Sequence, residues 1–453
     1  MQVETLNAIM YHNLIFVSAQ PDNVYFHWQV DLYLYQFAKH GIASQCYALF
    51  GYSTPEPSEG LRDLMARNPN VRAYKDDRRA AQAQYKQTYI PSIRPHVLKQ
   101  FFKDEPELGK CVFYHDSDIF FVKLPRFEMF LAPGDTKGYL SDTVSYIGYD
   151  YIVECAARYK AAHPALPDND ILTQMCECVG GVEPEMLKRN QRNAGGAQYL
   201  LKDIDAAYWE ACEAGCHKLY NMLKEYEAAH PVDHHIQSWT TDMWVVLWEY
   251  WKRGGQTEVH KELDFSWGTS TIAEYHDRTI FHLAGVTEKT CGDKFFKGKY
   301  ISSDVFKEYV KNPQIFAHVS KANATYGYVN VLKEFVHANE ARFGPVDLTL
   351  VPPPDQPEYN FFTLTFEGAK AYSGEYAKDE STVHFGKALW RTNKGYIIFF
   401  NGTAWILTHS RYENEISATC GGFVSCSDNE APYRSASTWN QPCVITNTFS
   451  EKV

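Results

Sequence analysis

The sequence lacks the features that mark membrane-spanning, secreted or nucleic-acid-binding proteins. No apolar run approaches the roughly 20 residues that cross a bilayer. The first residues, MQVETLNAIMYHN, do not show the basic and then apolar pattern of a secretory leader. The net charge of −11 at pH 7 opposes general binding to nucleic-acid phosphates. We therefore expect a protein that is cytoplasmic or otherwise soluble, with no membrane span and no nucleic-acid partner.

Cysteine is present, but without the regularity of a disulfide framework. The 11 cysteines are an odd number at irregular spacing, which favours a reducing compartment. The pairs Cys176/Cys178 and Cys212/Cys216 lack a second pair at the spacing of a zinc site. We therefore expect structural or incidental thiols.

The chain is rich in core-forming and aromatic residues. Apolar residues make up 45% and charged residues 22% of the 453 positions, which predicts a large packed core. The aromatic content of 15% is typical of carbohydrate-handling proteins, because flat rings stack on sugar faces, although aromatic cores are commoner. With this negative charge, any phosphate ligand must be held by a local cluster, such as a metal with a few basic residues.

The most informative stretch is residues 110–123, KCVFYHDSDIFFVK. Two short apolar runs flank Asp116 and Asp118, so the two carboxylates lie at the end of a buried strand. Buried carboxylates are costly unless they are paired, and a divalent cation such as Mg²⁺ or Mn²⁺ pairs them with oxygen ligands. The alternative is a solvated turn between two hairpin strands, where Asp and Ser are ordinary residues.

Strands and helices alternate through the first part of the chain. This alternation predicts a parallel α/β sheet whose ligands bind at the carboxyl ends of the strands, where Asp116 and Asp118 lie. We expect strands at residues 14–18, 44–50, 70–74, 259–267 and 279–285, and helices at 24–39, 168–178, 203–226 and within 303–342.

Other candidate residues accompany these elements. Arg94 serves either as a surface charge or as a donor to a bound nucleotide. Gly195 and Gly196 precede a strand and let the backbone approach a ligand closely, or else form a tight turn with positive φ. Asp242 begins a helix, either as its N-cap or as a carboxylate at the mouth of a Trp-rich pocket.

His282 and the lysines after it form the last candidate group. His282 lies in the apolar run TIFHLAG, either as a satisfied core residue or as a third ligand to a metal held by two Asp. The lysines neutralise a diphosphate or simply face water; they are Lys289, Lys294, Lys297 and Lys299.

The carboxy-terminal part differs in composition from the rest. Prolines concentrate in residues 346–357, which predicts a semi-rigid linker. Beyond it, YIIFFNGTAWIL at residues 396–407 places Asn-Gly between two β runs, a strong hairpin signal. We expect a catalytic domain at residues 1–345, this linker, and a small all-β domain at 358–453.

The motifs together resemble a GT-A-fold glycosyltransferase that uses a nucleotide-sugar donor. HDSD resembles the Asp-x-Asp motif of that fold, NAGGAQYLL its glycine-containing strand, and IFHLAG its late His ligand. More narrowly, YFHWQV, YIPSIRPHVL and QSWTTDMW resemble the hydroxyproline O-arabinosyltransferases and peptidyl serine α-galactosyltransferases of plants and algae. The chain departs from them in Ile93, where Asn is usual, and in its carboxy-terminal β domain, which looks like modules of algal or viral proteins. Unlike these enzymes, it is also expected to have no membrane anchor.

The resemblance implies a Rossmann-like GT-A domain and a metal-dependent transfer, with retention, from a UDP-sugar to a protein or glycan hydroxyl. By resemblance Asp118 and His282, with or without Asp116, hold Mn²⁺ or Mg²⁺ across the donor diphosphate, and Asp242 acts at the anomeric carbon. The donor would also contact Arg94, His115, Ser117, Gly195, Gly196, Lys294 and Lys297. Two alternatives stay open: a non-catalytic carbohydrate-binding protein, and a metal-dependent phosphohydrolase, which needs further clustered ligands that the sequence does not show.

Overall fold

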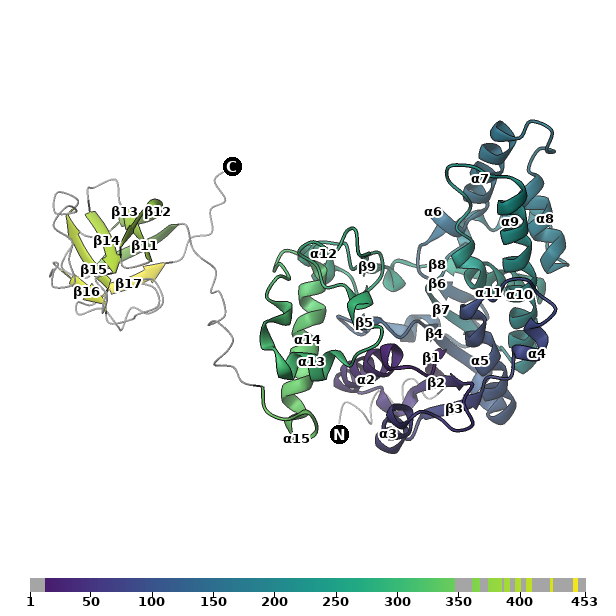
Figure 1. The fold of residues 1–453 in the computed structure, drawn as a ribbon, viewed down its shortest axis with the longest axis horizontal. Coiled ribbons are helices and arrows are strands. Elements are labelled where there is room, and N and C mark those ends of the chain that lie inside the picture. Colours follow the sequence, from purple (N-terminus) through teal and green to yellow (C-terminus); the bar gives the residue numbers. More distant parts are fainter. Residues whose placement is uncertain are drawn as a thin grey trace. The chain divides into compact units, whose positions relative to one another are not determined.

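The computed structural model describes residues 13–346 and the backbone of seven later strands between residues 361 and 446 (Figure 1). For residues 80 and 81 the description is likewise limited to the backbone. Contacts divide the chain into two units, Met1–Val351 and Pro352–Val453. Apart from residue 346, the predicted linker lies outside the described residues, and the domain boundaries stay a prediction.

A seven-stranded sheet forms the centre of unit 1, in the order β3-β2-β1-β4-β7-β6-β8. Six strands run in one direction, and β7 alone is antiparallel to its neighbours β4 and β6. The bounds are β1 Leu14–Pro21, β2 Cys46–Tyr52, β3 Val71–Lys75, β4 Cys111–His115, β6 Gly138–Leu140, β7 Gln198–Lys202 and β8 Thr257–Val259.

Helices cover both faces of this sheet (Figure 1). One face carries α2 (Val24–Lys39) and α3 (Glu59–Arg67), and the other carries α5 (Ile93–Asp104), α10 (Ala206–Ala229) and α11 (Thr241–Lys252). The bounds predicted for α2 are confirmed: the Asn23 side chain accepts a hydrogen bond from the Phe26 N–H at its start. Helices on both faces explain why the central strands read as continuous apolar runs rather than alternating ones.

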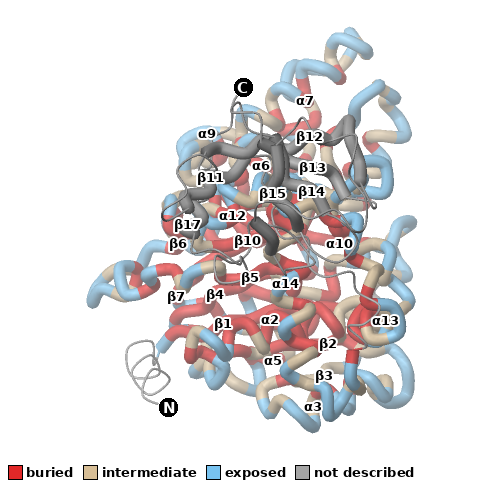
Figure 2. Tube along the Cα trace, turned by 90° about the vertical axis from the view of Figure 1, so that its left-hand side faces the viewer, coloured by how far each residue is buried: buried red, intermediate tan, exposed pale blue. Residues whose placement is uncertain are grey.

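The core lies between the sheet and these helices, where the central strands are buried (Figure 2). Phe16 of β1 contacts Phe113 of β4 and Phe121 edge-to-face, with ring centroids 5.8 and 5.9 Å apart. Phe37 of α2 stacks on Phe121 at 4.2 Å. Each fully buried aromatic ring of this kind contributes about 1.5–3 kcal/mol, so the strand that carries Phe121 is held firmly against α2.

That strand, β5 (Ile119–Phe121), belongs to a second sheet with β10 (Ile280–His282) and β9 (Phe265–Trp267). The pairing sets Ile119 opposite His282, and the Leu283 N–H donates to the Asp118 carbonyl at 3.0 Å. The hairpin alternative for residues 110–123 is therefore wrong, because β4 and β5 lie in different sheets. The chain between them crosses from one sheet to the other and carries Asp116 and Asp118.

Two other predictions need correction. Residues 259–267 form two strands, β8 and β9, because the His260 side chain accepts from the Glu262 N–H and closes the 3₁₀ turn Lys261–Leu263 between them. The helical stretch within 303–342 is divided, because Pro313 begins a 3₁₀ turn after α13. Its helices are α13 Val305–Lys311, α14 Ala324–Ala338 and α15 Glu340–Phe343.

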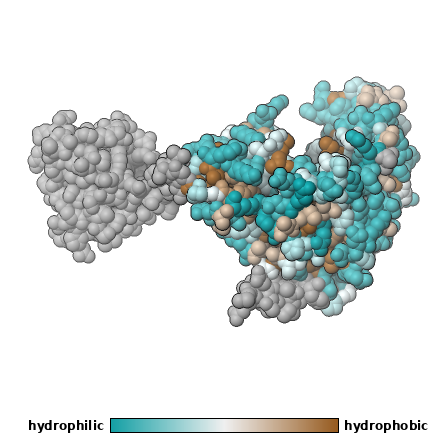
Figure 3. Space-filling model, turned by 60° about the horizontal axis from the view of Figure 1, so that its bottom comes forward, coloured by the Kyte–Doolittle hydropathy of each residue, from teal (hydrophilic) through white to brown (hydrophobic). Residues whose placement is uncertain are grey.

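The remaining helices of unit 1 pack around these layers. The predicted helix over 168–178 is confirmed as α8. These helices are α4 Arg79–Gln82, α6 Val144–Ile147, α7 Tyr149–Ala162, α8 Asp170–Val179, α9 Pro184–Arg189 and α12 Ile272–Asp277. The surface seen in Figure 3 is mostly hydrophilic, and hydrophobic residues gather beside the notch between the part with α12 to α15 and the part with α7 to α9.

Unit 2 forms a seven-stranded antiparallel sheet in the order β16-β15-β14-β13-β12-β11-β17. The predicted hairpin is confirmed, since β14 and β15 pair in antiparallel fashion, from Phe400 opposite Trp405 to Tyr396 opposite His409. The turn between the two strands lies outside the described residues. The bounds are β11 Phe361–Phe366, β12 Gly374–His384, β13 Lys387–Arg391, β14 Tyr396–Phe400, β15 Trp405–His409, β16 Val424–Cys426 and β17 Cys443–Thr446.

The predicted fold class is therefore confirmed: a Rossmann-like α/β domain with a mostly parallel sheet precedes a unit whose described residues are all β-strands. In the part of the chain that the structure describes, no helix combines the length and apolarity that crossing a membrane requires.

Candidate metal and ligand site

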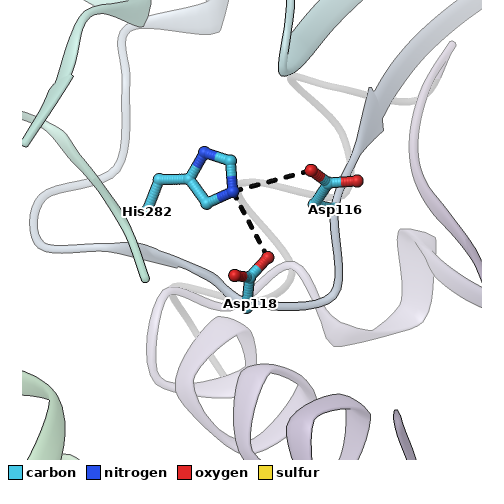
Figure 4. Close-up of side chains that lie close together, drawn as sticks. All are labelled: Asp116, Asp118 and His282. Atoms are coloured by element: carbon cyan, nitrogen blue, oxygen red, sulfur yellow. Dashed lines mark ion pairs between the residues drawn. The ribbon is translucent and has the colours of Figure 1, made fainter. Parts of the chain in front are cut away.

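Three side chains from two sheets converge at the carboxyl end of the central strands (Figure 4). Asp116 and Asp118 follow β4, and His282 is the last residue of β10. His282 Nε2 lies 3.5 Å from Asp116 Oδ2 and 3.3 Å from Asp118 Oδ1. Within residues 13–346, this is the one group of three such side chains whose ligand atoms lie close enough, within 4.8 Å of one another, to share an ion.

The chemistry and spacing of this group fit a divalent cation. Two carboxylates and an imidazole are the ligand types that Mn²⁺ accepts. Ligand distances of about 2.1 Å place adjacent ligand atoms about 3 Å apart, close to the observed 3.3 and 3.5 Å. Asp118 is only 4% and His282 only 5% exposed. Burying the charged Asp118 carboxylate without cationic partners would cost free energy.

Lys297 supplies one such partner. It begins the 3₁₀ turn Lys297–Tyr300, and its ammonium donates to Asp118 Oδ2. Burial by itself would raise the pKa of Asp118, but the charge of Lys297 and the contact with His282 hold that pKa far below its usual range. The Tyr25 hydroxyl of α2 lies beside the same ammonium. Lys297 thus places a positive charge directly at the carboxylate that faces His282.

The second ring nitrogen of His282 contacts a side chain of the central sheet. His282 Nδ1 lies 3.3 Å from Gln198 Nε2, and the Ser141 hydroxyl donates to Gln198 Oε1 at 2.6 Å. Histidines that bind metals are usually oriented through this nitrogen. Sequence reasoning missed Gln198, since a glutamine in a strand carries no motif; its position opposite His115 in the β4–β7 pair is a tertiary property.

Arg94 joins the Asp pair to Asp242. Its guanidinium, on the first turn of α5, lies 2.9 Å from Asp116 Oδ1 and 2.9 Å from Asp242 Oδ2. The Tyr89 hydroxyl donates to the other Asp242 oxygen at 2.7 Å. Burial lowers the pKa of Arg94, but Asp116 and Asp242 outweigh it and raise that pKa well above its usual value. The Arg94 guanidinium therefore fixes the positions of the Asp116 and Asp242 carboxylates relative to each other.

Asp242 is not the N-cap of α11. It lies in the first turn, with Thr240 at the cap position, and it is buried. Burial and the neighbouring Asp242 charge raise the pKa of Tyr89 far above its usual value, so its hydroxyl stays protonated and donates to Asp242. The carboxylate is thus held in place by a phenol and a guanidinium from the segment that leads into α5.

Asp116 and Asp242 face a common cavity of about 200 Å³. It is lined by Pro91, Arg94, Tyr114, Asp116, Ala197, Tyr199, Trp239, Asp242, Met243 and Val246. Ala197 has φ +66°, a left-handed conformation that costs a residue with a Cβ free energy. This strained residue follows the glycine pair directly and forms part of the cavity wall.

The glycine pair packs against protein. A Cβ on Gly195 would lie 2.1 Å from the Ser141 carbonyl oxygen, and one on Gly196 would lie 2.4 Å from the Tyr199 hydroxyl. Neither glycine has positive φ, so the tight-turn alternative is wrong. The two glycines allow the chain to pass close to the end of β6, which brings Ala197 to the cavity; their contact with a donor stays a prediction.

The other three residues predicted to contact the donor make contacts outside the Asp116–Asp118–His282 cluster; they are His115, Ser117 and Lys294. His115 packs its ring against Tyr33 and Phe37, and burial lowers its pKa to about 4, so it is neutral at pH 7. The buried Ser117 hydroxyl donates to Gln29 at 3.3 Å. Lys294 pairs with its neighbour Asp293 at 3.3 Å. Their predicted roles stay predictions.

Comparison with known proteins gives distant structural likenesses only. No protein-family model and no curated protein matches the chain. The bifunctional glycosyltransferase WbbM matches with 11% identity and a TM-score of 0.36 over 68% of this chain, which spans about half (51%) of that structure.

Two further matches are of the same kind. The galactosyltransferase LgtC, solved with donor and acceptor sugar analogues, matches with 12% identity and a TM-score of 0.31 over 60% of this chain and 87% of its own. The mannosyltransferase PcManGT from Pyrobaculum calidifontis, solved with GDP-Man and Mn²⁺, matches with 11% identity and a TM-score of 0.23 over 53% and 71%. Likenesses at this level do not identify the activity, which must follow from the residues of the site.

Proposed function

We propose that residues 13–346 form a metal-dependent glycosyltransferase that moves a sugar from a UDP-sugar to a protein or glycan hydroxyl, with retention of anomeric configuration. The observation that carries the proposal is the convergence of Asp116, Asp118 and His282 at the carboxyl end of the parallel strands. In open α/β sheets this edge is where ligands bind.

Asp118, His282 and Asp116 would hold Mn²⁺ or Mg²⁺. When bound, such a cation supplies Lewis-acid neutralisation of the negative charge on a diphosphate leaving group. Lys297, already at the Asp118 carboxylate, would add electrostatic stabilisation. If the Lys297 ammonium moved away from the Asp118 carboxylate, it could pair with a phosphate oxygen of the donor.

Asp242 is the proposed carboxylate beside the anomeric carbon. Glycosyl transfer passes through an oxocarbenium-like state, which a nearby negative charge stabilises. Asp242 shares the 200 Å³ cavity with Asp116 and is desolvated, and electrostatic effects are strongest where water is excluded. Arg94 and Tyr89 fix its orientation in advance, so little reorganisation is needed during the reaction.

A thermal-shift experiment tests this function. The full chain is melted with Mn²⁺ and a panel of UDP- and GDP-sugars, and again with EDTA in place of the metal. We expect a UDP-sugar to raise Tm only with Mn²⁺; at 100 times Kd the stabilisation is about 2.7 kcal/mol. If no nucleotide sugar raises Tm with metal present, a non-catalytic carbohydrate-binding protein becomes the better account.

The role of His282 is tested separately. His282→Ala should weaken Mn²⁺ binding by more than about 10-fold, because one of three protein ligands is lost and loss of an outer-shell partner alone typically costs 10- to 100-fold. The free Mn²⁺ signal in electron paramagnetic resonance measures this affinity. His276→Ala, an exposed histidine of α12, is the matched control and should bind Mn²⁺ like the parent. An unchanged affinity in His282→Ala would make His282 a core residue.

A further inference from the structure

Two cavities meet at one wall formed by Pro91 and Trp239. The inner one is the 200 Å³ cavity that contains Asp116 and Asp242. The outer one is a groove of about 460 Å³. The groove is lined by Thr88, Tyr89, Ile90, Pro91, Tyr220, Lys224, Glu227, His235, Ile236, Gln237, Ser238 and Trp239. The groove and the cavity of Asp242 are therefore neighbours, and Trp239 lines both.

Trp239 is unusually exposed for its size and yet firmly held. Its side chain is 60% exposed, and Ile90, also in the groove, is 67% exposed. The Trp239 carbonyl oxygen lies 2.8 Å from the Tyr89 hydroxyl oxygen, and Tyr146 stacks near one face of the indole with ring centroids 6.2 Å apart. A fixed, exposed aromatic face beside a ligand cavity is typical of a binding platform rather than of the core.

The polar side chains of the groove carry little net charge. Lys224 and Glu227 neutralise each other at 2.7 Å, and Gln237 adds neutral hydrogen-bonding groups. A phosphorylated or strongly acidic ligand would find no excess of positive charge there. An aromatic face with neutral polar groups suits a sugar ring, whose C–H face packs on the indole while its hydroxyls take hydrogen bonds.

Among the described residues, the groove has no strand edge to which an extended peptide could add. Its residues come from the segment before α5, from α10 and from the segment before α11, and none of them belongs to a strand. Peptides that bind along a protein backbone usually add to a sheet edge. The groove therefore offers side chains and not a row of free backbone partners.

We propose that this groove is the acceptor subsite, that it binds the terminal ring of a neutral glycan, and that Trp239 is the platform on which that ring stacks. The assignment rests on the proposed function for its catalytic meaning, while the sugar binding itself does not depend on it. It places the acceptor hydroxyl at the Pro91–Trp239 wall, facing the cavity that Asp242 shares with Asp116.

The test uses the full chain and an equimolar mixture of methyl α- and β-glycosides of galactose, glucose, arabinose and xylose. Saturation-transfer-difference NMR measures glycoside binding without nucleotide, and calorimetry measures UDP binding with Mn²⁺ in a separate experiment. We expect the parent to bind at least one glycoside, Trp239→Ala to bind it about tenfold more weakly or not at all, and Trp239→Phe to retain most of the affinity. Met129→Ala, another exposed apolar residue (42%) outside both cavities, should match the parent.

The outcomes separate the subsite from the activity. Equal glycoside affinity in Trp239→Ala and the parent overturns the subsite. So does a parent that binds no glycoside, whether or not a serine- and hydroxyproline-containing peptide binds in its place. A parent that binds UDP with Mn²⁺ while failing these tests keeps the proposed function. Conversely, loss of glycoside binding in Trp239→Ala supports sugar binding in the groove even where UDP does not bind, and then the glycosyltransferase activity and the acceptor role of the groove fail together.

Discussion

Asp118→Asn should abolish metal-dependent nucleotide binding while leaving the protein folded. Asn keeps the size of the side chain but removes the anionic ligand, and the cluster is left with Asp116 and His282. Loss of an outer-shell partner alone typically lowers metal affinity 10- to 100-fold. We therefore expect the loss of a direct ligand to lower the affinity for Mn²⁺, and with it the Mn²⁺-dependent affinity for UDP, by more than about 100-fold. Calorimetric titration of UDP in the presence of Mn²⁺ measures it.

Asp277→Asn, at the exposed end of α12, is the matched control for this substitution. It removes the same charge from the chain and should bind UDP and Mn²⁺ as the parent does. Circular dichroism melts of both variants check the fold, because Asp118 is buried and loses its pairing with Lys297. Nucleotide binding by Asp118→Asn at the affinity of the parent, with metal present, would show that the Asp pair is not the metal site.

Asp242→Asn should lower turnover by about two to four powers of ten, or about 3–5 kcal/mol of barrier. The substitution removes the charge proposed to stabilise the oxocarbenium-like state, and Asn can still accept from the Tyr89 hydroxyl. Donor affinity should change little, because this stabilisation develops mainly in the transition state. Steady-state rates with a UDP-sugar, together with UDP affinity, separate the two effects.

Glu249→Gln is the control for Asp242→Asn. Glu249 is also a buried carboxylate of α11, is paired with Lys252 at 2.8 Å, and lines neither cavity. It reports what losing a buried charge in this helix does to stability, and its turnover should remain within a few-fold of the parent. NMR of the product determines the anomeric configuration. An inverted product together with an active Asp242→Asn enzyme would exclude the role proposed for Asp242.

Local patterns in the chain were sufficient for the framework of unit 1. The apolar run at residues 14–18 and the amphipathic pattern that begins after Asn23 predicted β1 and α2, because burial and capping depend on residues near one another in sequence. The same holds for Asp116 and Asp118, whose position after a buried strand follows from their own neighbours. The division of 259–267 into two strands was missed, because the cap formed by His260 leaves the apolar pattern unchanged.

The residues that complete the site depend on contacts between distant segments. Sequence reasoning missed Tyr89 and Trp239, although both lie in stretches that the resemblance had singled out, since aromatic residues there are equally compatible with a core. Only the packing of the segment before α5 against the start of α11 leaves the Trp239 side chain exposed and places Tyr89 on Asp242. Arg94 likewise had two open roles until its two carboxylate partners were known.

The sequence by itself determined most of the elements, the position of the Asp pair after a buried strand and the edge of the sheet at which a ligand would bind, because these follow from hydrophobic periodicity and from the alternation of strands and helices. The tertiary structure alone decided which side chains meet there. The crossing of β5 to a second sheet, and its pairing with β10, bring His282 to Asp118 across more than 150 residues of chain. This pairing depends on the burial of the two strands against α2 and α14. It cannot be predicted from a local sequence pattern, because the segments involved are far apart in the chain.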